Sequence, residues 1–215
     1  MLYFCCMKIE IWSDIMCPFC YIGKRHLEQA LQQFPELEVN IEWKSFQLDP
    51  SISSQPGKDV YTYLAERKGM SVTESKQMHQ QVADRAKEVG LDYHFDKVVI
   101  ANSMNAHRLI QLAKTKGFGD KMEEVFFKAY FTDGADLANV DQLMQLGIEA
   151  GLNPLDIKET IENEDFTTAI QQDIVEAQQI GVSGVPFFVF DRKYAISGAQ
   201  PIDVFINTIR QLIAS

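Results

Sequence analysis

The sequence has few cysteines, and all of them lie near one end. Cys5, Cys6, Cys17 and Cys20 are the four in 215 residues, and none follows Cys20. The disulfide framework of a small secreted protein would spread its cysteines along the chain. A zinc site would need a second pair of ligands at a compatible spacing, which adjacent Cys5 and Cys6 do not supply. We therefore expect neither a disulfide scaffold nor a metal site, and we assign no role to Cys5 and Cys6.

Long apolar runs and an excess of positive charge are also missing. No apolar run approaches the roughly 20 residues of a membrane-spanning helix. Residues 1–7 are too short for a signal peptide and have no basic start, so we expect them to form a loose tail. The 30 acidic residues outnumber the 20 lysines and arginines, and the formal net charge is −10. This balance argues against nucleic acids and anionic membranes as partners and, with the cysteine usage, favours a cytoplasmic protein.

Cys17 and Cys20 stand at a change of pattern. Residues 8–12 alternate as a strand does, with Ile9 and Ile11 separated by charged side chains. Residues 19–34 carry apolar side chains at helical spacing. Pro18 suits the first position of a helix, where its missing N–H is no loss. The pattern therefore predicts Cys17 at the N-cap and Cys20 one turn later, on the buried side.

This placement has chemical consequences for the two sulfurs. The free N–H groups of the first turn and the positive end of the helix dipole would point at the Cys17 sulfur and stabilise a thiolate. A thiolate is the form that attacks disulfides, and a shielded Cys20 could resolve the mixed disulfide that results. Two core cysteines, or half of a metal site, are the alternatives. The strand before the pair and the capped helix after it favour a redox pair.

The remainder of the chain divides into a helical block and a second α/β part. Residues 37–45 alternate as a half-buried strand, so a parallel βαβ unit is expected at the start of the chain. Residues 50–164 show helical patterns without a convincing strand and are too many for a loop. After a long helix from residue 165 come a proline-led apolar strand to Phe190, a hairpin strand and a last helix.

With the helical block set aside, this order is that of the thioredoxin fold. We therefore expect an α/β protein with a large all-α domain inserted after the second strand. The predicted domains are 1–49 with 165–215, and the insertion 50–164. The chain resembles the DsbA-like family of thiol–disulfide oxidoreductases and, within it, the cytosolic FrnE-type branch. The resemblance covers residues 8–215 and is carried by the sequences SDIMCPFCYIG at 13–23, NSMNAHR at 102–108 and GVSGVPFF at 181–188.

The resemblance implies roles for particular residues. Cys17 would be the nucleophile and Cys20 the resolving cysteine. Pro186 would be cis, would face the cysteines and would present the Val185 backbone to a substrate chain. His107 has a second interpretation, as a satisfied polar residue of a helix. The candidate substrate contacts are Pro18, Phe19, Asn102, His107, Val185 and Pro186.

Two further interpretations concern neighbouring positions. Asp14 could tune the reactivity of the pair or simply cap its loop. An aromatic cluster cannot face inward as a whole on one regular helix, so an exposed remainder could contact a substrate or a second copy of the chain in a homodimer. That cluster consists of Phe126, Phe127, Tyr130 and Phe131.

The predicted activity is thiol–disulfide exchange through a mixed disulfide. The expected partners are a protein or small-molecule thiol or disulfide, and a glutathione-like thiol or a reductase that resets the pair. No cofactor is expected. A different enzyme class is a glutathione-dependent isomerase similar to hydroxychromene-carboxylate isomerase, although such enzymes generally lack the second cysteine. The third alternative is a non-catalytic chaperone or binding module.

Overall fold

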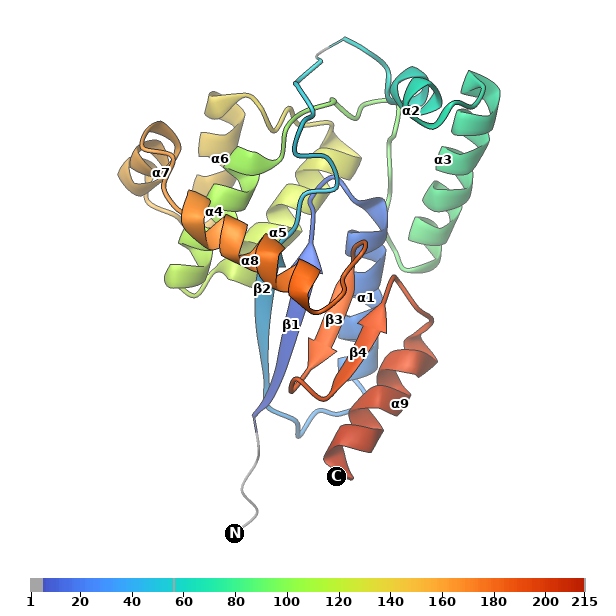
Figure 1. The fold of residues 1–215 in the computed structure, drawn as a ribbon, viewed down its shortest axis with the longest axis vertical. Helices are drawn as coiled ribbons and strands as arrows, with labels where there is room; N and C mark the ends of the chain where they lie inside the picture. Colours follow the sequence, from blue (N-terminus) through green and yellow to red (C-terminus); the bar gives the residue numbers. More distant parts are fainter. Residues whose placement is uncertain (1–5, 56, 215) are drawn as a thin grey trace. The chain divides into compact units, whose positions relative to one another are not determined.

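We describe the protein from a computed structural model, which describes residues 6–55 and 57–214. The chain forms two compact units. One consists of the chain up to Leu48 together with the chain from Ala169 onward, and the other is Asp49–Thr168. The first unit is α/β and the second is helical (Figure 1). The units divide at 48/49 and 168/169, whereas the sequence places the domain limits at 49/50 and 164/165.

A four-stranded sheet with the order β2-β1-β3-β4 organises the α/β unit. Strands β1 and β2 are parallel, and β3 runs antiparallel to both β1 and β4. Helix α1, Pro18–Leu31, connects β1 to β2, which confirms the predicted βαβ unit. The strands are β1 Met7–Ser13, β2 Val39–Ser45, β3 Phe187–Phe190 and β4 Tyr194–Ser197.

The first strand starts earlier than the sequence suggests. Met7 is buried, and its N–H donates to the carbonyl of Glu38 over 2.9 Å. The prediction of a loose tail through residue 7 is therefore wrong at Met7, because this residue extends the alternation and pairs with β2. Cys6 is exposed, and the prediction for Cys5 lies outside the described residues.

One face of the sheet is apolar. Alternate residues of β1, Ile9 and Ile11, share this face with Phe188 and Phe190 of β3, which are their pairing partners. Helices α1 and α9, Ile202–Ile213, cover it, and Phe205 of α9 packs edge-on against Phe188 with ring centroids 4.9 Å apart. In the view of Figure 1, α1 lies behind the sheet. Because all of these rings are fully buried, this face supplies the hydrophobic core of the unit.

The opposite face carries the other alternate residues and is covered by α8, Thr167–Gln179, in front of the sheet in Figure 1. Trp12 is fully buried there against Ala177, and its Nε1 donates to the carbonyl of Asp173 over 2.9 Å. The cationic groups of Lys44 and Arg192 lie 6.0 and 5.8 Å from the Trp12 ring centroid. Both distances are within the range of cation–π attraction, so two charged side chains lie within reach of the indole.

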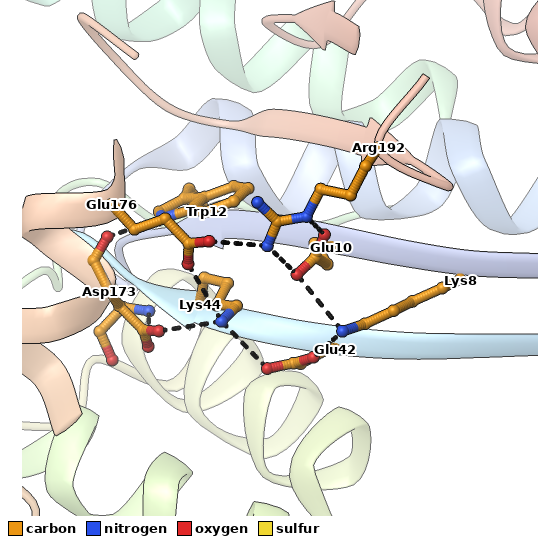
Figure 2. Close-up of polar contacts among 9 residues, drawn as sticks. Lys8, Glu10, Trp12, Glu42, Lys44, Asp173, Glu176 and Arg192 are labelled. Carbon is orange, nitrogen blue, oxygen red and sulfur yellow. Dashed lines mark hydrogen bonds and ion pairs between the residues drawn. The ribbon is translucent and has the colours of Figure 1, made fainter. Parts of the chain in front are cut away.

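Around Trp12, this face holds a network of ion pairs (Figure 2). The Arg192 guanidinium pairs with the buried Glu10 carboxylate and, over 2.7 Å, with Glu176 of α8. Lys8 reaches Glu10 over 3.4 Å from the same strand. Glu10 is thus a carboxylate with a nearly inaccessible side chain that two cations neutralise. Paired burial of this kind avoids the large penalty of an isolated charge.

Lys44 is the centre of the second half of the network. Its ammonium group lies 3.1 Å from Glu42, 3.3 Å from Asp173 and 3.2 Å from Glu176. The other Asp173 oxygen accepts the backbone N–H of Ser45 over 2.9 Å. Burial alone would lower the pKa of Lys44, but the nearby carboxylates raise it above its usual value. We call this surface, made of Lys8, Glu10, Glu42, Lys44, Asp173, Glu176 and Arg192, the charged face.

Among the described residues of the second unit, the regular elements are helices, and one isolated bridge joins Gln55 and Ile100. Several of its helices begin with side-chain caps, such as the capping box of Ser71 and Glu74 at the start of α3. The helices are α2 Val60–Lys68, α3 Val72–Glu88, α4 Met104–Thr115, α5 Gly119–Lys128, the π-helix η1 Ala129–Asp133, α6 Val140–Ala150 and α7 Pro154–Glu162.

The prediction that part of the aromatic cluster is exposed is wrong. Phe126, Phe127, Tyr130 and Phe131 are all buried. The physical reason is the π-helix at Ala129–Asp133, because its wider turn changes the angular position of the residues that follow α5. Phe127 and Phe131 consequently stack with centroids 6.5 Å apart. The cluster therefore leaves no exposed aromatic patch for a partner.

Candidate active site

The two cysteines lie at the junction of β1 and α1. Cys17 is the N-cap residue of α1 with extended backbone angles, and Pro18 follows in the first helical position, as predicted. The N–H of Cys17 donates to the Asp14 carbonyl over 2.9 Å and closes the turn that leads out of the strand. The N–H of Cys20 donates to the Cys17 carbonyl over 3.0 Å. The end of a strand and the start of a helix thus hold the two cysteines one turn apart.

The Cys17 sulfur faces the loop before β3. Its thiol donates a hydrogen bond to the Val185 carbonyl over 3.3 Å, across 168 positions of sequence. The bond between Val185 and Pro186 is cis, as the resemblance implies. The sulfur makes no hydrogen bond with the N–H groups of the first turn, which differs from the expectation. A protonated thiol is a donor, so it turns to a carbonyl rather than to another donor.

Cys20 is the deeper of the two cysteines. Its side chain is 1% exposed, whereas that of Cys17 is 4% exposed, and both are free thiols. Burial raises the pKa of the Cys20 thiol well above its usual range, and contact with Cys17 raises it further. The nearby Asp14 backbone and Ser13 hydroxyl lower this pKa, because both would stabilise an anionic Cys20 sulfur. The two sulfurs are thus in contact, with the buried one disfavoured as an anion.

Helix α1 approaches β3 closely at Gly23. A β-carbon built at this position would lie 3.0 Å from the Phe188 ring and 3.0 Å from the Pro186 ring. A larger side chain at Gly23 would push the helix that carries Cys17 and Cys20 away from Pro186. Sequence reasoning gave Gly23 no role, although its place three residues after the second cysteine was a visible signal.

The structure favours the loop-capping interpretation of Asp14. One carboxylate oxygen accepts the N–H of Met16 over 3.2 Å, and the other accepts the N–H of Leu48 over 2.8 Å. These contacts fasten the turn before Cys17 to the segment that follows β2. Asp14 therefore shapes the loop that carries the pair.

The predicted substrate contacts fall in both units. Pro18, Phe19 and Val185 are partly buried residues of the α/β unit, beside the cysteines in sequence or in space, and Pro186 is buried next to them. Their role in binding a substrate stays a prediction.

Asn102 and His107 belong to the helical unit. The Asn102 amide donates to the Ile52 carbonyl over 2.9 Å, and its oxygen accepts the Met104 N–H over 2.9 Å. These bonds hold the segment before α4. His107 is buried on α4 itself. Both side chains have structural surroundings within their own unit, and a contact with substrate stays a prediction for each.

A cavity of about 350 Å³ lies in the helical unit. It contains no cysteine, so it belongs to a different part of the molecule from the thiol pair. His79 lines it, and its Nδ1–H donates to the Ser75 carbonyl over 2.7 Å. The lining residues are Tyr61, Lys76, His79, Gln80, Ala83, Tyr93, Phe95 and Asp96.

Within residues 6–55 and 57–214, no group of three or more His, Cys, Asp or Glu side chains could hold a metal ion. Over the same residues, none of the helices has the length and apolar character needed to cross a membrane.

Comparisons with known proteins agree with this geometry. The family model of the DSBA-like thioredoxin domain matches residues 8–210. The Streptomyces coelicolor protein SCO1869, described as a probable DsbA oxidoreductase, has a crystal structure that matches with a TM-score of 0.91 and 34% identity, covering 97% of this chain and 91% of that one. YwbO of Bacillus subtilis (strain 168), an uncharacterized protein, is 28% identical over 209 residues, which are 94% of this chain and 96% of YwbO.

A more distant structure is the cytosolic disulfide reductase DsbM of Pseudomonas aeruginosa. It matches with a TM-score of 0.65 and 16% identity, covering 97% of this chain and 100% of DsbM, and it has also been solved with GSH. At this identity the likeness shows the fold alone. The predicted thioredoxin fold is confirmed by these matches.

Proposed function

Because the chain belongs to the DSBA-like thioredoxin domain family, we propose that it is a thiol–disulfide oxidoreductase with Cys17 as nucleophile and Cys20 as resolving cysteine. Thiol–disulfide oxidoreductase chemistry in general follows from the family, and the assignment of the two roles is the proposal. The observation that carries it is the contact of the two sulfurs at the start of α1, with Cys17 the less buried of the pair.

The proposed reaction is a pair of exchanges. The Cys17 thiolate attacks one sulfur of a substrate disulfide, and the substrate's other sulfur leaves as a thiolate with the electron pair of the broken bond. Cys20 then loses its proton and attacks the Cys17 sulfur, which releases the second substrate thiolate. The protein ends as the Cys17–Cys20 disulfide and the substrate as two thiols. The reverse sequence oxidises a substrate dithiol.

The Val185 carbonyl supports a role in substrate binding. It accepts a hydrogen bond from the Cys17 thiol in the reduced protein, so it lies beside the sulfur that would form the mixed disulfide with the substrate. Once Cys17 is in a disulfide it has no proton to donate, and this carbonyl can accept an N–H from an extended substrate chain. Pro18 and Phe19 flank the same sulfur along the chain. Asn102 and His107 are retained as proposed contacts on the resemblance alone.

The partners are part of the same proposal. A protein or small-molecule disulfide would be the substrate, and a glutathione-like thiol or a reductase would reset the pair in the cytoplasm. The GSH-containing structure of DsbM supports this choice of thiol as an analogy between similar folds. Membership of the FrnE-type branch and a homodimer stay predictions.

Serine substitutions test the two roles. Cys17→Ser should abolish the protein's catalysis of insulin reduction by a thiol. Cys20→Ser should also lower turnover and should accumulate a mixed disulfide on Cys17 that mass spectrometry detects. Cys6→Ser removes an exposed free cysteine and serves as the control, with an unchanged rate. Full insulin reduction by both Cys17→Ser and Cys20→Ser would refute the proposal.

The same variants separate the other two functions. A glutathione-dependent isomerase would keep its activity on a small molecule in the Cys20→Ser protein, because it needs no resolving thiol. A binding module with idle cysteines would show no insulin reduction above background even as the unsubstituted protein.

A further inference from the structure

The resolving step places a negative charge on a buried sulfur. Cys20 must become a thiolate before it can attack the mixed disulfide on Cys17, and it leaves as a thiolate when the internal disulfide is opened. Its side chain is 1% exposed, so water can do little to stabilise that charge. Cys17 itself becomes neutral in the disulfide. The protein must therefore supply hydrogen-bond donors at Cys20.

Ser13 is in the right place to be one of these donors. It is the last residue of β1 and, by strand alternation, lies on the apolar face in line with Ile9 and Ile11, with its side chain near Cys20 of α1. Its side chain is 1% exposed. A serine at this position interrupts an otherwise apolar set of residues that point toward α1.

The Ser13 hydroxyl is unsatisfied in the reduced protein. Among the described residues, no group meets normal hydrogen-bond geometry with its oxygen. Burying a hydroxyl without a partner is unfavourable, and an alanine at the same place would avoid this cost. The hydroxyl nevertheless lies close enough to the Cys20 sulfur to act as a donor to its thiolate. A neutral thiol is a weak acceptor and a thiolate is a strong one, so this donor gains a good partner only when Cys20 ionises.

We propose that Ser13 is a positioning residue of the redox site, whose buried hydroxyl donates a hydrogen bond to the Cys20 thiolate during resolution. The proposal rests on the function proposed above. The backbone N–H of Asp14 supplies a second donor that no side-chain substitution removes. Ser13 neither gains nor loses a proton in the reaction. Its hydrogen bond stabilises the Cys20 thiolate. That thiolate attacks the Cys17 sulfur, so the Cys17–Cys20 bond forms as the mixed disulfide breaks and the substrate thiolate leaves.

Two consequences of losing the hydroxyl oppose one another. A hydrogen bond to a charged group shifts the balance between thiolate and thiol by about 10- to 100-fold, so Ser13→Ala should raise the pKa of Cys20. A more basic thiolate is also more nucleophilic, with a Brønsted slope of about 0.4–0.5, which recovers roughly half of that effect on a logarithmic scale. At neutral pH the resolving step should therefore slow by about 3- to 10-fold. Well above the raised pKa, the variant should be the faster of the two.

The test follows the two steps separately in a full-length Cys5→Ser/Cys6→Ser background, which removes the other thiols. Reduced protein is mixed with dithiobis(nitrobenzoate), a symmetrical disulfide whose thiolate product is coloured. The first release of colour reports attack by Cys17, and the second reports resolution by Cys20. Ser13→Ala should leave the first rate unchanged, slow the second at neutral pH and give a pH–rate curve that crosses that of the parent protein.

Ser75→Ala is the matched control. Ser75 is also fully buried with an unsatisfied hydroxyl oxygen, but it lies on α3 of the helical unit. It should change neither rate. The denaturation midpoint of Ser13→Ala should stay unchanged or rise, because no protein partner is lost. A second rate that is unaltered at every pH, or two rates that fall together with stability, would overturn the role of Ser13. A single release of colour in the parent protein would instead refute the proposed function.

Discussion

The two faces of the central sheet are built from alternate residues of the same strands, yet they are held by different forces. Ile9 and Ile11 point to one side and pack with phenylalanines against α1 and α9. Glu10 and Trp12 point to the other side. Arg192 links Glu10 to Glu176 of α8, and the Trp12 indole donates a hydrogen bond to the Asp173 carbonyl. Both sides exclude water from the strands. The apolar face does so with little dependence on pH or salt, whereas the charged face depends on both.

The difference extends to the active site. Along β1, the residues of the apolar face end at Ser13, near Cys20, and those of the opposite face end at Trp12, one residue earlier. Substitutions on the apolar face should therefore affect both stability and the redox pair, because α1 carries the cysteines. Substitutions on the charged face should mainly affect the free energy of unfolding. The following predictions test that division.

The largest effect is expected on the apolar face. Phe188→Ala should lower the free energy of unfolding by about 3–5 kcal/mol, because it removes a fully buried ring that packs against Phe205. Denaturant unfolding measures this loss, which should be the same at low and high salt. Val204→Ala on the same helix as Phe205 serves as the control with an effect within about 0.5 kcal/mol, since Val204 is exposed. A strong salt dependence of the Phe188→Ala loss would break the comparison.

A smaller loss is expected when the charged face is broken at Arg192. Arg192→Met strands the buried Glu10 carboxylate with Lys8 as its remaining cation, and should cost about 2 kcal/mol. This is below the loss of about 3–5 kcal/mol for a fully buried pair, because the Arg192 side chain is half exposed.

The double variant identifies the source of that loss. Adding Glu10→Leu to Arg192→Met removes the stranded carboxylate, so the double variant should be more stable than Arg192→Met alone. Denaturant unfolding of both variants and of Glu10→Leu completes the cycle. Losses that simply add would show that the ion pair contributes no coupling and that the two residues act separately.

Several features of the fold and site were predictable from the sequence because they depend on neighbours along the chain. The alternation before Cys17 predicts β1, and Pro18 predicts the N-cap position of Cys17. The GVSGVPFF motif identified Pro186 through a family resemblance, and the structure has the cis bond. Local pattern and motif therefore located the pair and the segment that faces it.

Other features depend on contacts between distant positions or on changes of backbone geometry. Glu10 has Arg192 as its partner 182 positions later, and alternation alone could not show that a charged residue of β1 would be fully buried. The π-helix at Ala129–Asp133 overturned a face assignment that assumed a regular helical period. The sequence shows Ser13 as a polar residue at the end of an apolar alternation, but its proposed role depends on how deeply Cys20 is buried in the fold.

The smallest expected effect concerns Glu42 of the charged face and the pH dependence of the stability that it contributes. Burial would raise the pKa of Glu42, but hydrogen bonds from Lys8 and Lys44 and their charges outweigh it and lower the pKa to about 2. A carboxyl whose folded pKa is depressed stabilises the fold above its unfolded pKa of 4.5, and this stability is lost as the pH falls toward 2. Because the side chain is 30% exposed, the contribution should be at most about 1 kcal/mol.

Glu42→Gln should remove the stabilisation that ionised Glu42 provides. The unfolding free energy of this variant should therefore fall less steeply between pH 4.5 and 2 than that of the parent protein. Urea unfolding at a series of pH values measures the slopes. Glu36→Gln, at an exposed position outside the charged face, should keep the parent slope. If Glu42→Gln has the parent slope as well, the ion pairs of the charged face do not hold Glu42 ionised, and the contrast between the two faces rests on Glu10 and Arg192 alone.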